Sequence, residues 1–285
     1  MNKPNAIGIG AQKCASSWIH AMLRAHPQAH VAPEKELDFF SYYFDRGYRW
    51  YESFFDGAAA AVRFENSPSY FHDPRAPERV HGYDPAMKIV LLLRDPVERA
   101  YSNHLHEVIK GHIPPDLSFE DGLENNPSYL EQSRYGTHLG RWLQVFPRDQ
   151  VLVLLAEHIG KDPAQAARQL YRFLGIDADF TTGLLSERRN ESDRARWPWL
   201  RHLLRAQGDR MRAMGWEEHL MRIKKLPPFR QVLASNRIDV RAQVPPMRPR
   251  TRQRLVDELA DEMQVTARLL GRDPVEWPSW PGSPS

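Results

Sequence analysis

The run KIVLLLR, residues 88–94, limits the fold more than any other stretch of the sequence. Its five consecutive apolar residues leave a strand with no polar side, which indicates burial on both faces, as in a parallel sheet covered by helices. QVLVLLAE at 150–157 repeats this pattern, and AIGIGA at 6–11 and AVRFEN at 61–66 are further strand candidates. The sequence therefore predicts several buried, parallel strands.

Helical segments follow three of these strands. Ser16 or Ser17 is expected to cap a helix that runs to about residue 26. Asp95-Pro96 opens a helix to about residue 110, because proline suits the first helical turn, and DPAQAARQLYRFLG forms a helix that ends at Gly175. Strands that alternate with helices predict an α/β fold of three layers, in which helices flank a central, mostly parallel sheet.

The 285 residues are interpreted as a single domain in three parts. The α/β core is expected to span 5–175, and a C-terminal helix near 249–270 with a proline-rich tail makes up most of 251–285. Between them, 176–250 lacks the strand–helix rhythm, and from Arg188 to Arg254 there are 18 Arg and Lys residues against 6 Asp and Glu residues. This basic part is predicted to be a solvated surface segment, or else a lid or a substrate-facing region.

Composition indicates an ordinary globular chain, with 41% hydrophobic and 26% charged residues. The net charge of +3 suits an anionic ligand but is too small to indicate nucleic acid as a partner. The single cysteine cannot form an intrachain disulfide, no apolar run is long enough to span a bilayer, and the first residues show no signal-peptide pattern. We therefore expect a cytoplasmic protein without a membrane partner, and the sequence makes no prediction of the oligomeric state.

A loop of small and polar residues, QKCASS at 12–17, follows the first predicted strand. A helix N-terminus offers unpaired N–H groups and the positive end of the helix dipole, which together bind phosphate. In a kinase P-loop the lysine follows the small residues and precedes a hydroxyl that holds magnesium, whereas here Lys13 comes first. By itself, this loop is compatible with phosphate binding and with a plain structural turn.

Arg94 is predicted at the carboxyl end of the strongest strand, and Ser102 two turns into the next helix. Ligands of open α/β sheets bind beyond the carboxyl ends of the strands. A guanidinium and a hydroxyl at this place would hold a second, separate phosphate. The alternative is a structural ion pair of Arg94 with Asp95 or Glu98.

Together these segments resemble one family, the sulfotransferases that use 3′-phosphoadenosine-5′-phosphosulfate (PAPS). GAQKCASSW resembles their 5′-phosphosulfate loop, and RDPVERAYS resembles their 3′-phosphate motif. The likeness continues through KELDFF (35–40), YRWYESFF (48–55), ENSPSYF (65–71) and YGTHLGRWLQVFP (135–147), and it is nearest to the heparan-sulfate-type and related bacterial branches. The chain departs from the family at CASS, where Gly-Thr-Thr types are common. It also lacks, after residue 176, the lysine-glycine-arginine loop and the cysteine pair of the animal heparan enzymes.

The resemblance implies a P-loop-like fold and the in-line transfer of a sulfuryl group from PAPS, without a metal, to a hydroxyl or amine of a carbohydrate or small-metabolite acceptor. It implies that Lys13 stabilises the charge that develops on the leaving phosphate oxygen. Glu36 would be the general base, with a structural carboxylate as the alternative, and His106 would be the rival base or a donor to the sulfonate. The implied donor-binding residues are Gln12, Lys13, Cys14, Ala15, Ser16, Ser17, Trp18, Arg94, Ser102, Arg189 and Asn190.

Several of these assignments have a second interpretation. Trp18 could pack in the core rather than line the site, and His106 could be a satisfied buried histidine. Lys35 is interpreted as an exposed loop charge. Tyr135 and His138 could face either the nucleotide or the acceptor.

Two other functions compete with sulfuryl transfer. A P-loop nucleotide kinase is disfavoured because no Gly-Lys-Ser/Thr is present. A catalytically silent module of the same fold that binds nucleotide or glycan is disfavoured because the chain carries the whole predicted set, Lys13, Glu36, Arg94 and Ser102, although a fold never guarantees an activity.

Overall fold

A computed structural model of the chain describes residues 3–186, 193–195, 237–239 and 244–281. The chain divides into two compact units. The first consists of 1–103, 120–188 and 247–285, and the second of 104–119 and 189–246.

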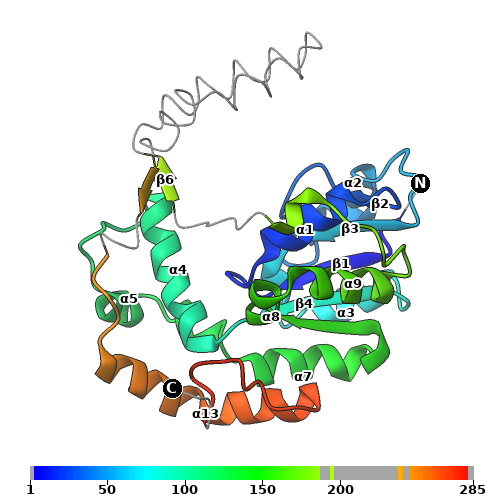
Figure 1. The fold of residues 1–285 in the computed structure, drawn as a ribbon. Helices are drawn as coiled ribbons and strands as arrows, with labels where there is room; N and C mark the ends of the chain where they lie inside the picture. Colours follow the sequence, from blue (N-terminus) through cyan, green and yellow to red (C-terminus); the bar gives the residue numbers. More distant parts are fainter. Residues whose placement is uncertain (1–2, 187–192, 196–236, 240–243, 282–285) are drawn as a thin grey trace. The chain divides into compact units, whose positions relative to one another are not determined.

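The first unit is built on a five-stranded sheet with the order β2-β3-β1-β4-β5 (Figure 1). Each neighbouring pair is parallel, which confirms the predicted sheet. The central strands are buried because their residues are apolar on both sides: Ile89 to Leu93 have no exposed surface. The strands are β1 Ala6–Gly10, β2 Ala29–Val31, β3 Val62–Asn66, β4 Lys88–Leu93 and β5 Val151–Leu155.

Helices flank this sheet, as predicted, and the four helices that the sequence predicts, α1, α4, α9 and α13, begin or end close to the expected residues. Asp162 caps α9 by accepting a hydrogen bond from the amide of Gln165, and Gly175 ends this helix with a φ of 78°. The helices are α1 Ser16–Ala25, α2 Gly47–Ser53, α3 Ala76–Tyr83, α4 Pro96–Lys110, α5 Phe119–Asn125, α6 Ser128–Glu131, α7 Tyr135–Val145, α8 Ala156–Lys161, α9 Pro163–Leu174 and α13 Pro249–Leu270. Short 3₁₀ turns are η1 Phe44–Arg46, η2 Pro68–Tyr70, η3 Arg148–Gln150 and η4 Gly183–Ser186.

The connections put helices on both faces of the sheet. β1 connects through α1 to β2, whereas β3 connects through α3 to β4, so the chain crosses the sheet in opposite directions. Because such crossovers are right-handed, α1 and α3 cover opposite faces. The contacts agree: Tyr171 of α9 packs 4.6 Å from His26 at the end of α1, and α7 packs against α3 and α13 (Figure 1).

The segment after α13, predicted to be a proline-rich tail, contributes to the core. Trp277 has no exposed surface, and its ring lies 5.9 Å from that of Tyr135. Asp95, also fully buried, caps α4 through the amide of Val97 at 2.9 Å and accepts a hydrogen bond from the amide of Ser279 at 2.7 Å. The strand end after β4 is therefore bonded to the C-terminal segment.

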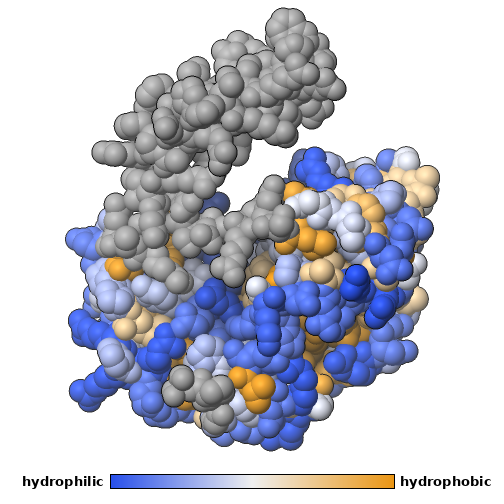
Figure 2. All heavy atoms as spheres, viewed as in Figure 1, coloured by the Kyte–Doolittle hydropathy of each residue, from blue (hydrophilic) through white to orange (hydrophobic). Residues whose placement is uncertain are grey.

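The second unit includes the C-terminal part of α4 and a short antiparallel pair, β6 Asp193–Ala195 and β7 Arg237–Asp239. The sequence does not predict this pair, because each strand has only three residues and they lie far apart along the chain. No helix in the described ranges is both long and apolar enough to cross a membrane. The face in Figure 2 is largely hydrophilic, with scattered hydrophobic residues.

Candidate active site

The ends of β1 and β4 form the topological switch point of the sheet. From β1 the chain leaves toward β2, and from the neighbouring β4 it leaves in the opposite direction toward β5. Ligands of open α/β sheets bind in the crevice that such divergent connections leave. The amide of Ala11 donates to the carbonyl of Leu92 at 2.7 Å, so the loop at 12–17 begins beside the strand end that Arg94 follows.

The loop turns sharply through residues with positive φ. Gly10 has a φ of 140°, and a Cβ atom here would lie 2.9 Å from Cβ of Phe71, so glycine is required. Lys13 and Ala15 follow with φ values of 68° and 69° in the left-handed region. Because non-glycine residues rarely adopt this conformation, the turn is a specific feature of the loop and not an ordinary connection.

The prediction that Ser16 or Ser17 caps the first helix is wrong. α1 begins at Ser16, and Ala15 occupies the cap position, where its side chain makes no capping hydrogen bond. The first amides of a helix have no intrahelical partner, so this end presents donors and the positive end of the dipole. The residues of the loop thus fit an anionic group better than the sequence pattern alone indicates.

Cys14 contributes its backbone to the loop, while its side chain is buried beneath it. The thiol lies 3.6 Å from the hydroxyl of Tyr135 and 3.7 Å from the carbonyl of Gln12. Burial raises the pKa of the Cys14 thiol to about 11, so it is a neutral packing group at physiological pH. Tyr135 is one of the two residues whose orientation the sequence left open. It is buried, and its hydroxyl contacts the loop through the thiol of Cys14.

Arg94 makes a long ion pair. Its Nη2 lies 3.8 Å from a carboxylate oxygen of Glu98, and the other oxygen of Glu98 is bound by Arg252. A separation of 3.8 Å is too long for a good hydrogen bond, and a guanidinium has five N–H donors. The structure therefore contains the predicted structural pair in a weak form that leaves Arg94 suited to a second anion.

Lys35 connects the predicted base to the loop. Its Nζ donates to the hydroxyl of Ser17 at 3.0 Å and lies 3.9 Å from the carboxylate of Glu36. Glu36 itself is about half exposed and has a φ of 64°. The interpretation of Lys35 as a plain exposed charge is incomplete, because this contact between 35 and 17 depends on the tertiary fold and leaves no sequence signal.

Other predicted residues are found as follows. Trp18 is half-buried, and its indole N–H has no hydrogen-bond partner in the described part of the chain. His138 is buried and bonds to the carbonyl of Glu131 at 2.7 Å, which makes it structural. Arg189 and Asn190 lie outside the described residues.

Ser102 and His106 both lie on α4, four residues apart as predicted. Ser102 belongs to the first unit and His106 to the second. His104, buried, bonds to the carbonyl of Leu117 at 3.1 Å within the second unit. The roles assigned to Ser102 and His106 stay predictions.

Asn66 is a residue that the sequence analysis did not single out. It is the last residue of β3, next to β1, and it is buried with both amide atoms lacking a hydrogen-bond partner among the described residues. A buried polar group without a partner destabilises the fold, which indicates that a ligand or water completes it. Its position at a strand end beside β1 adds it to the candidate site.

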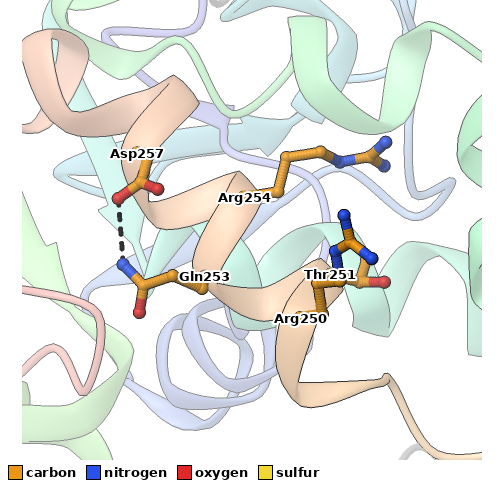
Figure 3. A pocket seen from close by; sticks show the side chains of 5 residues that line it. All are labelled: Arg250, Thr251, Gln253, Arg254 and Asp257. Carbon is orange, nitrogen blue, oxygen red and sulfur yellow. Dashed lines mark hydrogen bonds between the residues drawn. The ribbon is translucent and has the colours of Figure 1, made fainter.

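A separate depression of about 550 Å³ lies on α13 and not at the strand ends (Figure 3). Its lining comes from one face of this helix, where Gln253 donates to Asp257 at 2.9 Å. The lining residues are Arg250, Thr251, Gln253, Arg254 and Asp257. Because this depression is open and lined by a single helix, the switch point remains the candidate site. No group of three or more His, Cys, Asp or Glu residues in the described ranges could hold a metal ion.

The sheet, its switch point and the uncapped loop define the class: an α/β protein with a phosphate-type loop at the strand ends. A family model for the sulfotransferase domain matches residues 3–196. The chain belongs to this sulfotransferase family, which confirms the predicted family, the P-loop-like fold and the class of enzyme. The kinase alternative is not favoured.

Relatives and solved structures agree with this assignment. Heparan sulfate glucosamine 3-O-sulfotransferase 6 of Mus musculus is 32% identical over 180 residues, which covers 61% of this chain and 52% of the relative. Bifunctional heparan sulfate N-deacetylase/N-sulfotransferase 3 of Homo sapiens is 30% identical over 196 residues, with 61% and 22% covered. The chain thus spans about half the length of the first relative. The crystal structure of a sulfotransferase from Alicyclobacillus acidocaldarius has the same fold, with a TM-score of 0.71, 24% identity and coverage of 97% and 99%.

Proposed function

We propose that this protein transfers a sulfuryl group from PAPS to a hydroxyl or amine of a carbohydrate or small-metabolite acceptor. One observation carries the proposal: two cationic side chains follow the carboxyl ends of neighbouring parallel strands, Lys13 after β1 and Arg94 after β4. A donor with separate anionic groups at its 5′ and 3′ positions matches two separate cations, whereas a nucleoside triphosphate concentrates its charge at one end.

The loop fits the 5′ end of such a donor. The uncapped first turn of α1 supplies N–H groups for a phosphate, and Lys13 stands at the front of the turn. In sulfuryl transfer the acceptor oxygen forms a bond to sulfur while the bond from sulfur to the phosphate oxygen breaks. Negative charge develops on that phosphate oxygen, and an ammonium placed there lowers the barrier.

Glu36 is the proposed general base. The acceptor hydroxyl must lose its proton as its oxygen attacks, and a carboxylate within hydrogen-bond reach can take it. Glu36 is exposed enough to meet an acceptor, and Lys35 joins it to Ser17 of the loop. This connection between the base and the loop supports the choice of Glu36.

The acceptor class rests on the aromatic surface beside this base. The side chain of Tyr42 is 63% exposed, and its amide bonds to the carbonyl of Asp38 at 2.9 Å, two residues from Glu36. Exposed tyrosine rings are suited to stacking on sugars, since they offer an apolar face and a polar hydroxyl. The similarity to enzymes named for heparan sulfate supports a carbohydrate acceptor.

Binding and transfer can be measured separately. Isothermal titration with 3′,5′-adenosine bisphosphate, the product left after transfer, is expected to show binding in the presence of EDTA. ATP with Mg²⁺ is the control, and tighter binding of ATP would contradict the proposal. Transfer of ³⁵S from labelled PAPS to a panel of saccharides and small hydroxyl compounds is the second assay. Binding of the bisphosphate without transfer to any acceptor would instead support the silent module.

A further inference from the structure

The segment that carries Glu36 has an unusual backbone. Glu36 and Asp38 have φ values of 64° and 49°, in the left-handed region. Neither is glycine, so each of these conformations raises the free energy of the segment by about 1–2 kcal/mol. A turn of this kind persists only when the surrounding structure holds it.

Two hydroxyl groups hold this turn by accepting hydrogen bonds from its backbone. The amide of Asp38 donates to Oγ of Ser67 at 2.9 Å, and the amide of Phe39 donates to the hydroxyl of Tyr70 at 2.9 Å. A hydroxyl can donate as well as accept. Each therefore accepts reliably from the turn only if its own proton is directed to another acceptor.

Glu65 is that acceptor for both hydroxyls. Ser67 donates to Oε2 of Glu65 at 2.8 Å, and Tyr70 also bonds to this carboxyl. Tyr51 donates to Oε1 at 3.2 Å. Glu65 is 1% exposed, so no solvent competes for these bonds.

We propose that Glu65 is a positioning residue for the general base: its carboxylate orients the hydroxyls of Ser67 and Tyr70 and thereby fixes the turn that presents Glu36. The inference rests on the proposed function, because it assigns the base to Glu36. The role belongs to the ionised carboxylate, because it only accepts hydrogen bonds. If the side chain at position 65 carried N–H donors, at least one hydroxyl would accept a hydrogen bond from it instead of donating one to it. That hydroxyl would then no longer be oriented to accept from the turn. The variants are therefore compared at about pH 8, above the pKa of about 7 to which burial raises the Glu65 carboxyl.

Glu65→Gln tests this directly, because it keeps the size of the side chain and replaces one acceptor oxygen with a donor. Ser67→Ala removes one of the two hydroxyls and is the second variant if Glu65→Gln folds poorly. Ser67→Thr keeps the hydroxyl on an extended backbone that suits threonine. Glu52→Gln is the matched control, because Glu52 is a buried carboxyl that also accepts a tyrosine hydroxyl, from Tyr83 at 3.1 Å, outside this turn.

The first measurement is amide hydrogen exchange at residues 38 and 39, which needs no enzymatic activity. Glu65→Gln and Ser67→Ala are expected to raise the exchange rates there at least about tenfold, because the amides lose stable acceptors. Ser67→Thr and Glu52→Gln are expected to match the wild type. Unchanged exchange in Glu65→Gln would overturn the proposal whatever the enzyme does.

The second measurement is the turnover of PAPS with an acceptor identified by the panel above. kcat is expected to fall about 10- to 100-fold in Glu65→Gln and Ser67→Ala, as for a misplaced reacting group, while KM for PAPS and the affinity for the bisphosphate stay within about twofold. Combining Glu65→Gln with Glu36→Gln should give little further loss, because both act on one step. A parallel loss of nucleotide affinity, or additive losses, would overturn the role of Glu65. Full activity of Glu36→Gln would instead refute the assignment of the base.

Discussion

The pH dependence of stability offers a quantitative test of the buried Glu65 carboxyl. Burial raises its pKa from the ordinary 4.5 to about 7, against the opposing effect of the hydroxyls that donate to it. Between these two pH values the folded protein binds a proton that the unfolded chain has released. The free energy of unfolding must therefore decrease as the pH rises through this range.

The magnitude follows from the size of the shift. Each pKa unit corresponds to about 1.4 kcal/mol, so the contribution of Glu65 to the free energy of unfolding should decrease by about 3 kcal/mol between about pH 4 and pH 8. The change is concentrated between about pH 5 and pH 7. No discount for solvent screening applies, because the side chain is fully buried.

Urea denaturation at a series of pH values measures how the free energy of unfolding changes with pH, and so the contribution of Glu65 to it. The difference in unfolding free energy between the wild type and Glu65→Gln isolates it, because glutamine does not titrate. Tyr51→Phe provides the control, since removing a hydroxyl that lowers the pKa of Glu65 should move the decrease to higher pH. Parallel pH curves for the wild type and Glu65→Gln would refute the reasoning.

The remaining predictions concern four residues: Lys13 of the loop, Arg94 after β4, Lys35 between Ser17 and Glu36, and Gly136 of α7. Lys13→Ala should lower kcat about 100- to 1,000-fold in the ³⁵S transfer assay, and near-normal turnover would remove its assigned role. Arg94→Ala should weaken the binding of 3′,5′-adenosine bisphosphate by about 1.5–3 kcal/mol in titration calorimetry. It should hardly change the binding of adenosine 5′-phosphosulfate, which lacks the 3′-phosphate, and equal losses for both ligands would contradict the assignment. Lys35→Met should lower kcat/KM for PAPS about tenfold, because Lys35 no longer connects the hydroxyl of Ser17 to the carboxylate of Glu36. An unchanged kcat/KM would show that this connection does not contribute to catalysis. Gly136→Ala should lower the free energy of unfolding by about 1–3 kcal/mol, because its Cβ would lie 2.7 Å from a side-chain carbon of α13; identical urea midpoints would count against that close packing.

The parallel sheet could be predicted because its strands carry their signal locally. The apolar run at 88–94 admits few other structures, and Asp95-Pro96 and Gly175 mark helix ends by their own chemistry. The three-residue β2 was missed, since so short a segment has no period. The order of the strands, and with it the switch point, depends on pairings between distant segments.

The candidate site was predictable where residues act through their position along one element. Lys13 and Arg94 each follow a strand, so a parallel sheet places both residues after carboxyl ends at the same edge. The contact of Lys35 with Ser17 and the bonds that reach Glu65 could not, because each joins side chains brought together only by tertiary folding. The roles of Ser102, His106, Arg189 and Asn190 stay predictions, as does a cytoplasmic location.

The bond between Asp95 and Ser279 gives the C-terminal segment an influence on a remote part of the chain. Asp95 lies directly after Arg94 and begins α4, so its carboxylate serves the local helix and the distant serine at once. Proteolytic cleavage near residue 277, or a bulky fusion placed there, would break the hydrogen bonds between Ser279 and Asp95. Every proposed donor-binding residue would remain in the polypeptide. If Arg94 binds the 3′-phosphate as proposed, such damage is expected to weaken binding of the 3′ end of the nucleotide first.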